Sequence, residues 1–247
     1  MKTLVILHGW QSSKEKWQGV KENLEKEGIR VIVPDIPGFK PETALQKTWN
    51  LDDYLCWFKD FLAKEKGLWP DIAEGFFLLG HSFGARISLK FAKSNPEELK
   101  GLILVSAAGL KKRPTFFEKI FQWLVKMAKV LKIEELPFFS QGVAEFLKKI
   151  FYRFILRKTD YFRASGFLKE TIKNILNEDL TLLLGEISSP TLILWGEKDR
   201  ITPPEDAFLI KEKTKNSKLE ILKGVGHAPH LEKPQVLAQK IKEFLTR

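Results

Sequence analysis

The sequence predicts an α/β protein of three layers, in which a mostly parallel six-stranded sheet lies between helices. Six short apolar runs, rich in β-branched residues, each end at a cluster of Gly, Pro, Ser or Asp, and helix-sized segments separate most of them. Continuous apolar runs are typical of strands buried on both faces of a parallel sheet. Strands that alternate with helices favour right-handed crossovers and an open α/β sheet.

The expected elements follow in order along the chain. The predicted strands are 3–7, 29–33, 76–79, 101–105, 191–195 and 218–222. The predicted helices are 14–26, 52–66, 85–94, 205–215 and 235–246. Between the fourth and fifth strands lie about 85 residues, far more than one crossover needs. The sequence therefore predicts a core formed by residues 1–110 and 185–247, with an inserted helical cap, or lid, over residues 111–184.

The cysteine content and the lengths of the apolar runs predict the cellular compartment of the protein. Cys56 is the only cysteine of the chain, so an intramolecular disulfide is impossible and a reducing compartment is the simplest expectation. The apolar run at the start is too short for a secretory signal, and no segment reaches the length of a membrane span. We expect a soluble, cytoplasmic protein in which Cys56 is buried in the core on a helix.

The pentapeptide Gly80-His81-Ser82-Phe83-Gly84 is the most informative motif. It follows a predicted strand and precedes the predicted helix 85–94. A serine hydroxyl is a weak nucleophile, so a serine hydrolase exposes it on a tight strand-to-helix turn within reach of a base. Glycines on both sides suit the strained backbone of such a turn. The motif is therefore a candidate nucleophile elbow around Ser82.

Further motifs follow other predicted strands, where the functional groups of such sheets gather. These motifs are His8-Gly9-Trp10, Asp35 to Phe39, Trp195 to Arg200 and Gly224 to His230. Together with the elbow, they make the chain resemble the α/β-hydrolase superfamily, in which serine, acid and histidine follow in that order. The resemblance implies that Ser82 is the nucleophile, Asp199 the acid and His227 the base of a catalytic triad.

The resemblance also implies an oxyanion hole made by the backbone N–H groups of Trp10 and Phe83. Trp10, Phe39 and Phe83 are the predicted substrate-binding residues. The aromatic residues of the predicted cap, with Trp10 and Phe83 beneath them, favour an apolar acyl group. The chemistry needs no cofactor, and the four histidines lack the spacing of metal ligands. The expected activity is that of a carboxylesterase, in which the ester is cleaved through an acyl-serine intermediate.

Two competitors and two departures from the family pattern stand beside these assignments. Glu197 competes with Asp199, and His230 competes with His227, although its place near the next helix favours a structural role. His8 and His81 are expected to organise loops. Lys40 stands where related sequences often carry glycine. The family's sheet often begins with two further strands before the His8-Gly9 loop, so a trimmed sheet of about six strands is expected here.

The net charge of +10 is concentrated in the predicted insertion, where residues 111–179 hold fifteen Lys and Arg against eight Asp and Glu. Solvated helix faces are the simplest explanation, and the alternatives are an anionic membrane surface or an acidic carrier protein. No nucleic-acid-reading module accompanies the charge. The chain also resembles carbon–carbon bond hydrolases and carrier-protein methyl ester esterases, and a non-catalytic ligand-binding member of the fold is the alternative from another class.

Overall fold

The structure is a computed structural model that describes residues 1–110 and 166–246. The chain divides into two compact units, the first formed by residues 1–110 and 166–247 and the second by residues 111–165. The helical pattern predicted between 111 and 165 lies outside the described residues. No helix in the described ranges is long and apolar enough to cross a membrane.

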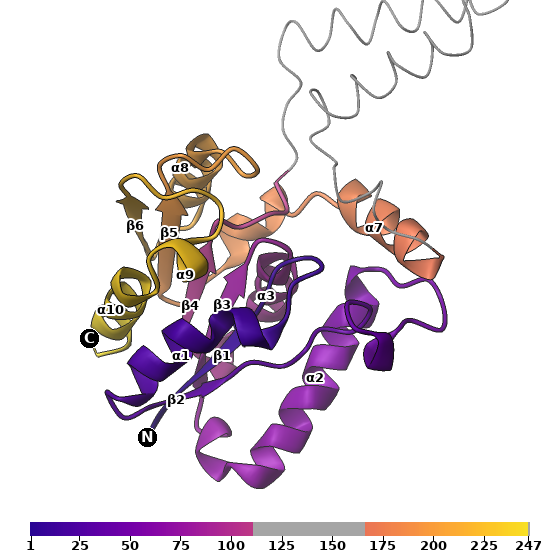
Figure 1. The fold of residues 1–247 in the computed structure, drawn as a ribbon, viewed down its shortest axis with the longest axis horizontal. Helices are drawn as coiled ribbons and strands as arrows, with labels where there is room; N and C mark the ends of the chain where they lie inside the picture. The colour runs from indigo at the N-terminus through magenta and orange to yellow at the C-terminus, as the bar shows by residue number, and fades with distance from the viewer. Residues whose placement is uncertain (111–165, 247) are drawn as a thin grey trace, which may run out of the picture. The chain divides into compact units, whose positions relative to one another are not determined.

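Six parallel strands form one sheet in the order β2-β1-β3-β4-β5-β6 (Figure 1). The strands are β1 Lys2–Leu7, β2 Ile29–Ile32, β3 Phe76–His81, β4 Leu99–Val105, β5 Thr191–Gly196 and β6 Ser217–Leu222. The order reverses after β2, because the chain returns to place β3 on the other side of β1. Each predicted strand is present, so the predicted fold class is confirmed.

Helices cover both faces of the sheet (Figure 1). They are α1 Gln18–Glu25, α2 Leu51–Leu68, α3 Phe83–Ser94, α7 Phe167–Asn177, α8 Pro204–Lys213, α9 Pro229–Glu232 and α10 Pro234–Leu245. Short 3-10 helices are η1 Lys14–Trp17, η2 Pro41–Thr43, η3 Pro70–Ile72, η4 Pro96–Glu98 and η7 Thr181–Glu186. Because successive side chains of a strand point to opposite faces, the sheet contributes to two apolar clusters. Leu4 and Ile6 pack in the cluster that includes α1 and α10, and Val5 and Leu7 in the cluster that includes α2, α3 and α8.

The expectation that Cys56 is buried was wrong, because its side chain is exposed. The residues that α2 buries are Leu51, Tyr54, Phe58 and Leu62, at the three- and four-residue spacing of one helix face. Cys56 lies off that face. A run of apolar and aromatic neighbours in the sequence therefore hid an amphipathic helix with a solvent side.

The segment after residue 165 packs on the same apolar cluster as α2 and α3. Ile175, Leu180 and Leu184 are buried there, and the backbone N–H of Trp49 donates to the hydroxyl of Thr171 over 2.9 Å. These residues lie within the range 111–184 that the sequence predicts as a cap, and they share one compact unit with the sheet. The division of the chain at residues 110 and 185 stays a prediction.

Candidate active site

Ser82 lies on the turn between β3 and α3, with φ +50° and ψ −112°. A positive φ is uncommon for a residue that is not glycine, and such strain is often stored at functional sites. Both flanking glycines are required by close approaches. A Cβ at Gly84 would collide with the backbone oxygen of Leu7, and one at Gly80 would lie 2.5 Å from the Cα of Ala85. Residues larger than glycine at positions 80 and 84 would therefore not fit the turn on which Ser82 lies.

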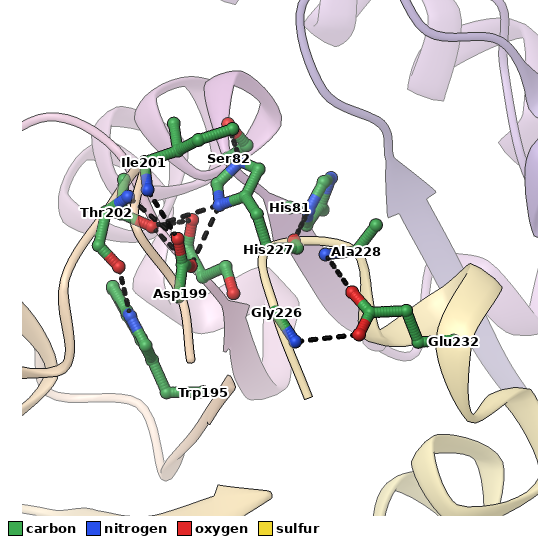
Figure 2. A network of polar contacts seen from close by, with 11 residues as sticks. His81, Ser82, Trp195, Asp199, Ile201, Thr202, Gly226, His227, Ala228 and Glu232 are labelled. Atoms are coloured by element: carbon green, nitrogen blue, oxygen red, sulfur yellow. Dashed lines mark hydrogen bonds and ion pairs between the residues drawn. The ribbon is translucent and has the colours of Figure 1, made fainter. Parts of the chain in front are cut away.

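The loop after β6 brings His227 to this serine (Figure 2). The His227 Nε2 atom lies 3.0 Å from Ser82 Oγ, and the Nδ1 atom lies 2.8 Å from Asp199 Oδ2. An ionised carboxylate only accepts hydrogen bonds, so Nδ1–H of His227 donates to Asp199 and leaves the Nε2 lone pair for the serine hydroxyl. The histidine side chain is 17% exposed and the aspartate side chain fully buried.

Asp199 follows β5 and accepts hydrogen bonds at both carboxylate oxygens. Its Oδ1 accepts from the backbone N–H groups of Ile201 and Thr202, at 2.9 and 3.0 Å, and its Oδ2 lies 2.9 Å from the Thr202 hydroxyl. Burial raises the pKa of Asp199, but His227 and these donors outweigh it and hold the pKa below its ordinary value. The acid is therefore ionised and fixed in orientation at neutral pH.

Glu197 and His230, the alternatives for the acid and the base, do not belong to this chain of hydrogen bonds. Glu197 accepts from the backbone N–H of Gly224 over 2.9 Å, at the start of the loop that carries His227. His230 is buried and stacks on Trp17, with ring centroids 4.3 Å apart and planes 4° from parallel. Ser82, His227 and Asp199 come together, whereas Glu197 and His230 support the surrounding loops.

Trp10, Phe39 and Phe83 cluster beside the serine. Phe83 is the first residue of α3, where backbone N–H groups have no partner within the helix. Trp10 lies in the loop after β1, and β1 pairs with β3 so that Leu7 faces Gly80. The ring of Trp10 meets those of Phe39 and Phe83 edge-on, at centroid distances of 4.8 and 5.2 Å. The three predicted substrate-binding residues thus form one aromatic wall.

Lys40 ties the loop of Phe39 to the helical turn that follows the Trp10 loop. Its Nζ atom lies 2.8 Å from Glu15 Oε1 and 2.9 Å from Asp35 Oδ2. Hydrogen bonds to Glu15 and then Asp35 raise the pKa of Lys40 to about 12. The departure from glycine at this position therefore adds an ionic link at the edge of the aromatic wall.

Two residues that support the candidate triad were not predicted from the sequence: Thr202 and Glu232. Besides its contact with Asp199, the Thr202 hydroxyl lies 3.1 Å from the carbonyl oxygen of Ser106 after β4. Glu232 accepts from the N–H groups of Gly226 and Ala228, on either side of His227, at 2.8 and 3.3 Å (Figure 2). A hydroxyl residue three positions after a loop aspartate was the available signal for Thr202, since such residues often bond locally. Among the described residues, no three His, Cys, Asp or Glu side chains gather as metal ligands would.

Comparison with known proteins places this chain in a family. The family model described as alpha/beta hydrolase fold matches residues 2–234. The chain is 29% identical to Lipase 3 of Moraxella sp. (strain TA144), over 98% of this chain and 76% of that protein. It is 27% identical to the mouse (Mus musculus) monoacylglycerol lipase ABHD6, over 98% of this chain and 75% of that protein.

A solved structure shows the same fold. The crystal structure of a membrane phospholipase A, described as a bacterial virulence factor, matches with a TM-score of 0.70 and 22% identity. The match covers 99% of this chain and 78% of that one. At this identity the likeness concerns the fold alone.

Proposed function

We propose that this chain, which belongs to the alpha/beta hydrolase fold family, cleaves carboxylic esters through an acyl intermediate on Ser82. The observation that carries the proposal is the continuous chain of hydrogen bonds from Ser82 Oγ through His227 to Asp199, at 3.0 and 2.8 Å. A nucleophile, a base and an orienting acid in this arrangement perform acyl transfer on several unrelated folds.

In the first half of the reaction, Ser82 Oγ attacks the ester carbonyl carbon while its proton moves to His227 Nε2. The tetrahedral intermediate collapses when the imidazolium returns that proton to the departing alkoxide, which leaves as an alcohol. Water then attacks the acyl-serine and gives a proton to His227, which passes it to Ser82 as the carboxylic acid leaves. Asp199 stays ionised and stabilises the imidazolium in both halves.

The negative charge of the tetrahedral intermediate needs donors that are already in place. The backbone N–H groups of Phe83 and Trp10 are the proposed oxyanion hole. Support comes from the position of Phe83 at the first turn of α3 and from the pairing of β1 with β3, which makes the two loops neighbours. The loss of one such donor typically costs about 3 kcal/mol in the activation barrier.

The acyl group of the substrate is proposed to be apolar. Trp10 and Phe39 offer partly exposed aromatic surface near Ser82. The buried rings of Phe83 and Tyr54 pack behind them, with centroids 5.0 Å apart. Aromatic surface binds apolar groups through the area that it removes from water. Two relatives over nearly the whole chain carry the name lipase, which fits esters of this kind.

A fluorophosphonate probe and a panel of p-nitrophenyl esters test the proposal. The wild-type protein is expected to be labelled and to prefer longer, uncharged acyl groups. Ser82→Ala should abolish labelling, and Ser82→Ala or His227→Ala should each lower kcat by about 10³- to 10⁶-fold. Ser94→Ala, which changes an exposed serine at the end of α3, is the control and should keep labelling and hydrolysis. Near-normal hydrolysis by Ser82→Ala would refute the mechanism, and a preference for charged acyl groups would refute the apolar pocket.

A further inference from the structure

The residue before the nucleophile contacts the residue proposed as the base. His81 is the last residue of β3 and is 5% exposed. Its Nε2 atom lies 2.9 Å from the backbone carbonyl oxygen of His227 (Figure 2). A carbonyl oxygen only accepts, so the Nε2 atom of His81 must carry the hydrogen. The backbone of the base is thus tied to the strand that ends at the nucleophile.

The surroundings of His81 fix this tautomer. Its Nδ1 atom is buried and has no hydrogen-bond partner in the part of the chain that the structure describes. A Cβ on Gly9 would lie 3.1 Å from that Nδ1 atom, so the backbone of the Trp10 loop packs against this edge of the ring. Burial, together with the neighbouring His230 and His227 rings, lowers the pKa of His81 well below its usual range.

Packing fixes the orientation of the ring as well. The His230 ring lies 4.6 Å from that of His81 in an edge-on arrangement, and Trp17 meets the ring at 5.8 Å. Trp17 and His230 in turn stack face to face. A donor whose ring is held by these two aromatic neighbours keeps its direction without a further loss of entropy when the loop binds it.

The other anchors of the loop do not replace this contact. Glu232 binds the N–H groups of Gly226 and Ala228, which flank His227. The N–H of Gly226 lies in the peptide between Val225 and Gly226, whereas the N–H of Ala228 and the carbonyl group of His227 belong to one planar peptide. Glu232 holds that peptide at 3.3 Å and His81 holds it at 2.9 Å. Without the His81 bond, this peptide keeps only the longer, exposed bond to Glu232, so it can tilt and carry the imidazole away from Ser82.

We propose that His81 is a positioning residue, whose Nε2–H group holds the carbonyl oxygen of His227 and thereby aligns that imidazole with Ser82 for proton transfer. The inference rests on the proposed serine hydrolase mechanism. His81 transfers no proton and touches no substrate in this role. It acts by keeping the 3.0 Å contact between His227 Nε2 and Ser82 Oγ in reacting geometry.

Two substitutions of matched length test the role of the donor. His81→Gln retains an N–H donor near the position of Nε2, and His81→Met has similar length without a donor. His81→Met should lower kcat by about 10²-fold with little change in KM, because misalignment of about 1 Å can cost that much. His81→Gln should recover most of the loss. Wild-type kcat in His81→Met, or equal loss in both variants, would overturn the proposal.

His230→Phe is the control for packing, since phenylalanine can keep the stack on Trp17 and neither the His81–His227 bond nor the triad is altered. It should retain kcat within about 3-fold, far less than the loss that misplacement of a reacting group produces. A loss as large as that of His81→Met would assign the effect to packing and contradict the proposal. Thermal unfolding of all three variants identifies any that fail to fold.

Histidine ¹⁵N NMR tests the contact in the wild-type protein, independently of activity. The His81 ring, assigned by comparison with His81→Gln, should be neutral with its proton on Nε2 between pH 6 and 8. A proton on Nδ1 alone would overturn the inference even if the enzyme is a serine hydrolase. Conversely, if Ser82→Ala keeps hydrolysing esters, the proposed function fails while the NMR result still decides the His81 contact.

Discussion

The side chain of Asp199 illustrates how a single residue is prepared for its role. Two backbone N–H groups bind one carboxylate oxygen, and the Thr202 hydroxyl and His227 meet the other. Thr202 is itself held, because its carbonyl oxygen accepts from the indole N–H of Trp195 over 2.7 Å. The carboxylate can therefore present only one oxygen, in one direction, to the imidazole.

Removal of the Thr202 hydroxyl should weaken this orientation. Thr202→Val keeps the shape and the backbone donors but leaves Asp199 Oδ2 and the carbonyl oxygen of Ser106 without the hydroxyl. We expect kcat to fall by about 10-fold, and the free energy of unfolding by about 1–3 kcal/mol, because the single hydroxyl hydrogen no longer serves a buried acceptor. Ester hydrolysis and urea unfolding measure the two effects.

Thr202→Ser is the matched control for that change, since serine keeps the hydroxyl and loses only a methyl group. It should restore most of the activity that the valine variant loses. Equal kcat values in the valine and serine variants would show that the hydroxyl does not orient the acid.

At the scale of elements, α3 holds α7 against the core. Arg86 of α3 is buried, and its Nη1 atom donates to the carbonyl oxygens of Ile175 and Glu178 at 2.8 and 3.2 Å. The last carbonyl groups of a helix lack intrahelical partners and carry partial negative charge. Burial lowers the pKa of Arg86 to about 10, so the guanidinium is charged at neutral pH. One side chain thus donates hydrogen bonds to the carbonyl groups at the end of a helix, and its partner Ile175 lies 89 residues away in sequence.

Arg86→Met should release this end of α7. The carbonyl oxygens would be left buried without their charged donor, which costs about 2–3 kcal/mol. We expect a lower midpoint of urea unfolding and faster proteolysis within residues 166–186. Arg86→Lys, which retains a positive charge but not the planar donor group, should fall between the two. Unchanged proteolysis in Arg86→Met would contradict the role of the arginine as an anchor.

The strands, the serine turn and Arg86 show what the sequence can and cannot predict. The inner strands β1, β3, β4 and β5 were predictable because a strand buried on both faces is a continuous apolar run, and the elbow because its glycines are required by contacts within and next to the turn. Arg86 gave no such signal. Its partners on α7 lie far along the chain, and a lone arginine on a helix is usually solvated.

The residues of the candidate site divide in the same way, into those that the sequence predicts and those that it does not. Ser82, Asp199 and His227 could be selected because each follows a strand at one edge of a parallel sheet, where such residues converge. The contact of His81 with the carbonyl oxygen of His227 joins residues 146 positions apart and involves a backbone atom. A backbone acceptor leaves no mark in the sequence, so only the structure reveals such a contact.

At the scale of the whole molecule, three of the four histidines are buried beneath the candidate site. His8 accepts from the backbone N–H of Ile36 over 3.0 Å, and His81 and His230 lie in the aromatic group with Trp17. Burial lowers the pKa of each, that of His230 to about 3 and that of His81 well below its usual range. The folded protein keeps all three neutral where the unfolded chain would already protonate them.

The stability of the fold should therefore decrease as the pH falls from about 6.5, the ordinary pKa of histidine, toward 5. In this window the unfolded chain binds protons that the folded protein excludes, so the free energy of unfolding should drop by up to about 1.4 kcal/mol per pH unit for each histidine. The carboxylates whose pKa is lowered, such as Asp199, add their loss only at lower pH, near and below their ordinary values. Urea unfolding at pH 7.5, 6.5, 5.5 and 5.0 measures the slope. His230→Phe removes one of the three groups and should make it shallower, whereas a free energy of unfolding that stays constant from pH 7.5 to 5.0 would show that these histidines are not held neutral by the fold.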